Sequence, residues 1–240
     1  GILLAALFLT PLLASLPIAT LAGTIIVAVL SLVDFKTPRA IWRYSKPDFM
    51  AMAATIAVTL LVGVEPGVIA GVGLSLALFL WRASRPHAAI VGRVPETEHF
   101  RNVKRHKVFT DTRILTIRID ESLTYLNARW LEEFVLEQVS EHADLRHLIL
   151  MCSAINGVDA SALESIEAIN HRLADGGIKL HLSEVKGPVM DALEKSHLLD
   201  DLSGKVWLSQ NEAFQSLIRS SDAEDNAPLS PDTMGPRGMI

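Results

Sequence analysis

The sequence predicts α-helical membrane spans followed by an α/β domain with a mixed, largely parallel sheet and helices packed on it. Three observations lead to this fold class. No charged residue precedes Asp34, and the apolar block from Phe49 to Trp81 contains a single charge, at Glu65. Beyond residue 88 charged residues become frequent. There, short apolar runs alternate with amphipathic helical patterns, as they do where helices pack on a parallel sheet.

The composition excludes several function classes. The net charge is −5 and no basic face is evident, which argues against nucleic acid as a partner. The single cysteine, Cys152, rules out an intrachain disulfide and suits a reducing compartment, and we expect it to be buried and inert. The eight histidines show no metal-ligand spacing, and phosphate-binding, dinucleotide-binding and hydrolase motifs are missing. We therefore expect no enzyme, no catalytic residue, no metal and no cofactor.

The first apolar run is too long for one span. As a single helix it would extend roughly 50 Å, whereas the hydrocarbon layer is about 30 Å thick. Pro11 and Pro17 offer a break, so we predict spans at 2–16 and 18–33. The chain begins at Gly1 inside this run, and we interpret it as a piece of a longer protein.

The second apolar block predicts a helical hairpin. Glu65-Pro66-Gly67 is a turn sequence, which gives helices at 49–64 and 67–81. Gly63, Gly67 and Gly71 are spaced by four residues, with Gly73 and Ser75 following. Small residues at this spacing allow helices to pack closely in lipid, and a hinge in a moving gate is the alternative interpretation.

Basic residues predict the orientation of the spans. Four of them lie in the loop at 34–48, and Arg82 and Arg85 follow the last span. Because positive charges mark the cytoplasmic side, we expect residues 1–88 to be a membrane domain and residues 89–220 to fold in the cytoplasm. Residues 221–240 are rich in Pro, Asp, Ser and Gly and predict a disordered tail.

The elements of the cytoplasmic domain follow from hydrophobic periodicity. Residues 87–107 predict a solvated linker and an edge strand, and contact of their five basic residues with anionic lipid headgroups is the alternative interpretation. The remaining elements, in chain order, are strands at 114–119 and near 123–126, a helix at 128–142, a strand at 148–151, a helix at 160–173, a strand at 178–182, a helix at 188–196, a strand at 205–208 and a helix at 211–219 that Asn211 caps.

The most informative stretch is Leu148–Leu163, which predicts a buried strand, a tight turn and a capped helix. Asp159 can accept a hydrogen bond from a first-turn amide, and Ser161 with Glu164 matches a capping box. The same geometry presents a carboxylate and a hydroxyl at a helix start, where partial positive charge favours anions. Asp159 and Ser161 are therefore either helix caps or a regulatory, anion-contacting surface.

This stretch carries a resemblance to a known domain family. The matching positions are Ser153, Ile155, Val158, Asp159, Ser161, Ala162 and Leu163, with supporting segments at 117–120, 125–128 and 177–189. They resemble the core motif of STAS domains (sulfate transporter and anti-sigma factor antagonist). In free-standing antagonists of that family, a serine directly after the Asp accepts phosphate. The corresponding residue here is Ala160, a departure that argues against switching by phosphorylation.

The apolar part resembles the C-terminal end of the sulfate permease (SulP) membrane domain. The residues concerned lie at 16–19, 26–29, 46–49, 63–67 and 82–86. In the family, earlier spans hold the anion between half-helix N-termini, so the resemblance implies no substrate-binding residue in this chain. It implies secondary active transport of sulfate or a related inorganic anion such as bicarbonate, by symport or exchange, with a STAS domain for regulation or assembly.

The resemblance also implies partners and a location. Expected partners are membrane lipid, the N-terminal spans of the same transporter, the anion and a second copy in a homodimer. The expected location is the inner (plasma) membrane, multi-pass, with the STAS domain in the cytoplasm. The alternative is a membrane-anchored STAS interaction module that does not transport.

Overall fold

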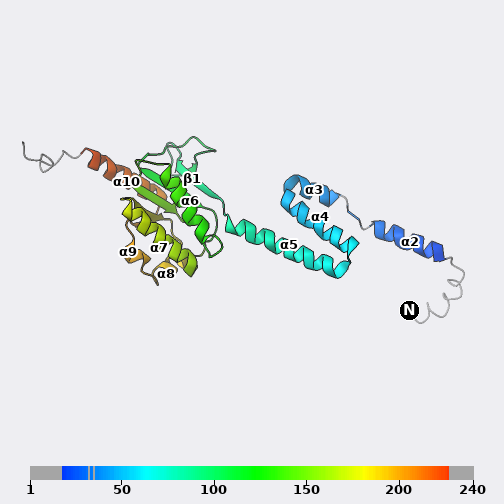
Figure 1. Cartoon of the computed structure of the whole chain (residues 1–240). Helices are drawn as coiled ribbons and strands as arrows, with labels where there is room; N and C mark the ends of the chain where they lie inside the picture. Colours follow the sequence, from blue (N-terminus) through cyan, green and yellow to red (C-terminus); the bar gives the residue numbers. More distant parts are fainter. Residues whose placement is uncertain (1–17, 32, 35, 227–240) are drawn as a thin grey trace, which may run out of the picture. The chain divides into compact units, whose positions relative to one another are not determined.

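The computed structural model describes residues 18–31, 33–34 and 36–226 (Figure 1). The chain divides into two compact units, and the division falls between Leu78 and Phe79. The predicted span at 2–16 and residues 227–240 of the predicted tail lie outside the described residues.

The first unit is helical. Its described helices are α2 (Ile18–Ser31), α3 (Lys36–Tyr44), α4 (Lys46–Leu61) and most of α5 (Val64–Ser84). By length and composition, two segments suit a membrane crossing, Ile18–Tyr44 and Val64–Ser84; the mean hydropathy of the most apolar 18-residue stretch is 2.2 in the first and 1.7 in the second. Helix α4 has 16 residues, about 24 Å, so it is shorter than the hydrocarbon layer.

Helix α3 occupies a segment that was predicted to be a loop. Its start is fixed by Asp34, whose Oδ1 accepts hydrogen bonds from Lys36 N at 2.7 Å and Thr37 N at 3.4 Å. Pro38 lies in the first turn, where its missing N–H costs nothing. An Asp followed closely by Pro is a helix-start signal, and the high charge of the segment obscured it.

The hairpin of α4 and α5 forms, with bounds that differ from the predicted 49–64 and 67–81. Helix α4 starts earlier because Ser45 accepts a hydrogen bond from Asp48 N at 3.4 Å. The turn lies at Val62–Gly63, where Gly63 has a φ of +134°. Glu65 and Pro66 stand in the first turn of α5, where a carboxylate and a proline are both favourable.

The hairpin packs through two of the glycines. A Cβ at Gly67 would lie 2.9 Å from the backbone Cα of Thr59, and one at Gly71 would lie 2.9 Å from Thr55 Oγ1. Gly73 has no atom within 4 Å of such a Cβ in the described chain. Close packing is therefore observed at Gly67 and Gly71, and at Gly67, which meets the backbone of Thr59, a side chain of any size would separate α4 from α5.

The second unit contains a six-stranded sheet of order β2-β1-β3-β4-β5-β6. The strands are β1 (Ala88–Arg93), β2 (Phe100–Asn102), β3 (Ile114–Ile119), β4 (His147–Met151), β5 (Lys179–Ser183) and β6 (Val206–Trp207). Strands β3 to β6 are parallel, and β1 pairs antiparallel with both β2 and β3. The sheet is mixed and largely parallel, as predicted. The strand predicted near 123–126 is wrong, because Leu123 makes only an isolated bridge to Val158.

Alternating residues of the central strands face two separate cores. Leu148 and Leu150 of β4 belong to the larger core, together with α6 (Ala128–Ser140), α7 (Ala160–Asp175), α8 (Gly187–Leu193) and α9 (Leu198–Asp201). Ile149 and Met151 face the opposite core, which α10 (Gln210–Asp225) covers with Phe214 and Leu217. Figure 1 shows α6 and α7 together on one face of the sheet.

Helix α10 is held to the sheet at both ends. Near its start, the buried Gln210 accepts a hydrogen bond from Ser183 Oγ at 2.6 Å and donates to Thr116 Oγ1 at 3.1 Å. Ser209 caps the helix by accepting from Glu212 N, so the predicted cap at Asn211 is wrong. The helix continues to Asp225, and residues 221–225 of the predicted tail are therefore helical.

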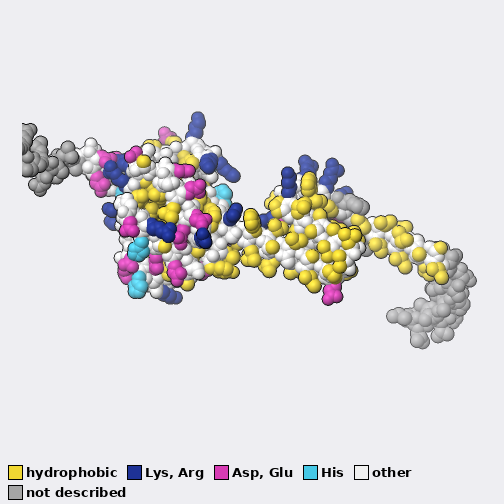
Figure 2. Space-filling view, viewed as in Figure 1, with side chains coloured by type: hydrophobic (Ala, Val, Ile, Leu, Met, Phe, Trp, Pro, Cys, Tyr) yellow, Lys and Arg dark blue, Asp and Glu magenta, His cyan; other side chains and the backbone are white. Residues whose placement is uncertain are grey.

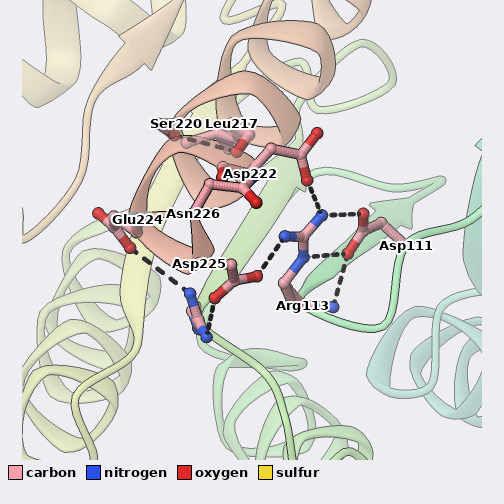
Figure 3. Close-up of polar contacts among 9 residues, drawn as sticks. Asp111, Arg113, Leu217, Ser220, Asp222, Glu224, Asp225 and Asn226 are labelled. Atoms are coloured by element: carbon pink, nitrogen blue, oxygen red, sulfur yellow. Dashed lines mark hydrogen bonds and ion pairs between the residues drawn. The ribbon is translucent and has the colours of Figure 1, made fainter. Parts of the chain in front are cut away.

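The C-terminal end of α10 is acidic, and Arg113 at the start of β3 compensates this charge (Figure 3). Its guanidinium donates to both carboxylate oxygens of Asp111, to Asp222 at 2.8 Å and to Asp225 at 2.7 Å. Arg146 donates to the other oxygen of Asp225 at 2.7 Å. Carboxylates at a helix C-terminus oppose the helix dipole, so these cations are what keep the last turn on the sheet.

Candidate functional site

Asp159 is the N-cap of α7 and joins this helix to the preceding loop. Its Oδ1 accepts from Ala162 N at 2.9 Å, and its Oδ2 accepts from Tyr125 N at 2.8 Å. Backbone bonds run beside these contacts, from Leu123 N to Gly157 O at 3.0 Å and from Asp159 N to Leu123 O at 3.1 Å. Both carboxylate oxygens are therefore used for structure.

Ser161 does not take part in the cap. Its side chain is exposed and makes no hydrogen bond within the described chain, so the predicted capping box with Glu164 is not formed. The box fails because Asp159 is the N-cap of α7, so Ser161 lies inside the first turn and cannot be the capping residue. The structure thus separates the two predicted site residues into a structural cap and a free surface hydroxyl.

A depression of about 400 Å³ lies beside the start of α7. Its walls come from α7 and from the segment around α8, and the lining includes Val158, Asp159, Ala160, Leu163, Pro188, Asp191, Leu193 and Lys195. Two carboxylates and one ammonium group face it, and Asp159 occupies the helix amide that an anion would need. This charge pattern favours the capping interpretation over an anion contact at the helix start.

Asn127 is the residue that sequence reasoning missed at this site. It is 1% exposed, and its Oδ1 accepts from Thr124 N at 2.9 Å. Its Nδ2 donates to Ser122 O at 3.0 Å and to Ala83 O, in the last turn of α5, at 3.2 Å. Sequence had shown Asn127 only as part of the STAS resemblance. The available signal was an amide side chain directly before a helix, a position that favours local backbone bonds.

A second connection lies beside the first. Asp120 accepts from His87 Nδ1 at 2.8 Å and from Arg118 Nε at 2.6 Å, and Asp120 N donates to His87 O at 2.9 Å. Burial raises the pKa of Asp120, but the hydrogen bonds from Arg118 and His87 outweigh it, and the pKa lies below its usual value. His87 directly precedes β1, so this cluster also fixes the entry into that strand.

Loop 122–127 therefore contacts two other structural elements, α7 and α5. On one side it receives the Asp159 carboxylate from the start of α7. On the other, Asn127 holds the backbone of the last turn of α5. A displacement of the α7 start must move this loop or break the Asp159 bonds, and the same holds for the end of α5. Loop 122–127 thus links the start of α7 to the end of α5.

Other chemically interesting groups lie away from this connection. Cys152 is buried, and burial raises the pKa of its thiol to about 12, which matches the predicted inert cysteine. His147 and His181 are buried on the α10 side, with 3.1 Å between His147 Nδ1 and His181 Nε2. Burial lowers the pKa of both, that of His181 to about 4. Among the described residues no three potential ligands gather into a metal-binding group.

Comparisons with known proteins agree with this architecture. The STAS domain model matches residues 107–213, and the model described as Sulfate permease family matches residues 1–55. The probable sulfate transporter 4.2 of Arabidopsis thaliana is 31% identical over 241 residues, which cover 93% of this chain and 36% of that protein. The chloroplastic sulfate transporter 4.1 of the same plant is 31% identical over 235 residues, covering 91% and 34%.

A solved structure shares the fold. The murine Slc26a9 anion transporter in its inward-facing state aligns with a TM-score of 0.68 at 16% identity, over 78% of this chain and 31% of that one. The chain spans about a third of the length of the curated relatives it matches. In this chain the sulfate permease match precedes the STAS match, and the chain belongs to the sulfate permease family, of which it carries membrane sequence and the STAS domain.

Proposed function

We propose that this chain is the C-terminal part of a secondary active transporter of inorganic anions, of the sulfate type. The observation that carries the proposal is the similarity to named sulfate transporters over 93% of the chain, across both the membrane helices and the STAS domain. A similarity limited to the STAS domain would have supported only an interaction module. Sulfate and bicarbonate are both candidate substrates, moved by symport or exchange through spans that precede this chain.

The STAS domain then acts on the membrane domain from the cytoplasmic side of the plasma membrane. Basic residues support this side, since Lys36, Arg39 and Arg43 in α3 and Arg85 after α5 follow the positive-inside rule. The role we assign to the domain is regulation or assembly, including contacts between two copies in a homodimer. Asp159 contributes by joining α7 to loop 122–127, and the exposed Ser161 lies where a regulatory partner can reach it.

The alternative is a membrane anchor for a partner-binding STAS domain. An anchor needs only a flexible tether between the helix and the domain. In this chain three residues separate α5 from β1, and the buried Asn127 bonds the end of α5. The bond between Asn127 and the last turn of α5 favours a domain whose movements reach the last span over one that is merely tethered.

The test is anion uptake by the full-length protein in proteoliposomes. We expect uptake of radiolabelled sulfate that excess unlabelled sulfate inhibits, and no uptake by the 240-residue chain alone, because the spans that hold the anion precede it. The Asn127→Ala variant should change the rate of uptake while Arg129→Ala, an exposed neighbour on α6, leaves it unchanged. Absence of uptake of sulfate and of bicarbonate by a correctly inserted full-length protein would contradict the proposal and support the anchor.

A further inference from the structure

Helix α3 has two chemically distinct faces. Lys36, Arg39 and Arg43 are spaced at i, i+3 and i+7, so their side chains share one face of the helix. Pro38 and Ile41 lie on the opposite face, and Trp42 lies beside them at its edge. Helix α3 contains no acidic residue, so its three cations are not neutralised within the helix itself.

The apolar face is already occupied by protein. Pro38 and Ile41 are half-buried, and the ring of Trp42 contacts that of Phe49 on α4 edge to face, with 4.7 Å between the ring centroids. This packing fixes the rotation of α3 about its own axis. The basic face is consequently turned away from α4, and it cannot reorient without losing the contacts of Pro38, Ile41 and Trp42.

The basic face has no partner within the described chain. All three cations are exposed, and none forms an ion pair with another described residue. Figure 2 shows dark blue side chains gathered on one side of the first unit, where the rest of the surface is largely hydrophobic. In contrast, Arg113, Arg118 and Arg146 of the second unit are all paired with carboxylates.

The position of α3 limits what can neutralise these charges. In the sequence it lies between the apolar helices α2 and α4, and α2 belongs to a segment apolar enough to cross a membrane, so the neighbours of α3 suit a lipid bilayer. Three unpaired cations are excluded from hydrocarbon, and Trp42 and Tyr44 are exposed aromatic residues of the kind that favours the membrane–water interface. A short amphipathic helix with these features lies in the interface, where phosphate groups are the available anions.

We propose that α3 is an interfacial helix whose basic face binds the phosphates of anionic phospholipids. The proposal depends on the chain being a membrane protein and does not depend on transport. It assigns the site to Lys36, Arg39 and Arg43, with the α4 contact of Trp42 holding the helix in the orientation that presents them.

Quenching of Trp42 by brominated lipid tests the proposal. The 240-residue chain, carrying Trp81→Phe, Trp130→Phe and Trp207→Phe, is reconstituted in phosphatidylcholine vesicles. In one preparation a minor fraction of brominated phosphatidylglycerol is included, and in the other the same fraction of brominated phosphatidylcholine. We expect the anionic lipid to quench Trp42 at least about twofold more strongly, because phosphates gather at the basic face. High salt should remove the difference, because it screens exposed charges.

Two variants separate this site from general attraction. Lys36→Gln, Arg39→Gln and Arg43→Gln together should abolish the preference for anionic lipid. The matched control, Lys104→Gln, Arg105→Gln and Lys107→Gln, removes the same charge from an exposed loop of the STAS domain and should preserve it. Equal quenching by both lipids would overturn the proposal. That result is expected if a second copy or an acidic protein segment, and not lipid, covers the basic face. A preference that survives the α3 substitutions would overturn it too. The salt dependence of the parent chain decides the question even if the α3 variant does not insert.

Discussion

Replacing Asp159 with alanine removes two hydrogen bonds that tie the start of α7 to loop 122–127. One is the cap from Ala162 N to Oδ1, and the other runs from Tyr125 N to Oδ2. Loss of an aspartate N-cap costs about 1 kcal/mol. A hydrogen bond to a charged group contributes about 1.5 kcal/mol, the low end of its range, because this carboxylate is half-exposed. Together they lower the free energy of local opening by about 2.5 kcal/mol.

Hydrogen exchange measures this loss directly. A change of about 2.5 kcal/mol in the opening free energy speeds exchange roughly 70-fold where the opening equilibrium sets the exchange rate. The assay is mass spectrometry of the detergent-solubilised chain, followed through peptides that contain Tyr125 and Ala162. We expect both peptides to lose protection in Asp159→Ala, while the β4 peptide, from the buried centre of the sheet, keeps it.

Two variants make the prediction sharper. Asparagine caps helices as well as aspartate does but has a single carbonyl oxygen, so Asp159→Asn should protect Ala162 and expose Tyr125. Ser161→Ala should alter exchange by less than the equivalent of about 0.5 kcal/mol, as expected for an exposed side chain without partners. If Ser161→Ala had the larger effect, or if Asp159→Ala left the Tyr125 peptide unchanged, the proposed connection through loop 122–127 would be refuted.

Three further predictions concern packing and charge. Gln210→Ala leaves two buried hydroxyl groups on β3 and β5 without their partner. It should therefore lower the free energy of unfolding of the STAS domain by about 2–4 kcal/mol, measured by urea unfolding followed by circular dichroism. A loss below about 0.5 kcal/mol would contradict the buried network. Gly67→Leu should lower the melting temperature of the detergent-solubilised chain because it separates α4 from α5, whereas Gly73→Leu, which meets no neighbour in the described chain, should not. Equal effects at the two sites would disprove the packing argument. Burial lowers the pKa of His181 to about 4, so between pH 6.5 and 4 the unfolded chain binds a proton that the folded domain excludes. Stability should fall as the pH drops through that window and should fall less steeply in His181→Gln; identical slopes would show that His181 is not responsible.

The sequence by itself determined the class of each part of the chain. Apolar runs almost free of charge predicted α2, α4 and α5, and the alternation of apolar strands with amphipathic helices predicted β3 to β6 in a largely parallel sheet. These features are local, since they depend on side-chain period and on the exclusion of charge from apolar surroundings. The N-cap role of Asp159 was predictable for the same reason, because a cap acts within one helical turn.

Only the tertiary structure decided which side chains act across long distances. The second bond of Asp159 reaches Tyr125, and Asn127 reaches Ala83; no periodic pattern encodes either pair. The last turn of α10 belongs to the fold because Arg113, far away in the sequence, offsets its acidic charge. Short-range preferences fix helices and strands, whereas a buried amide or an ion pair depends on where the folded chain places its partner.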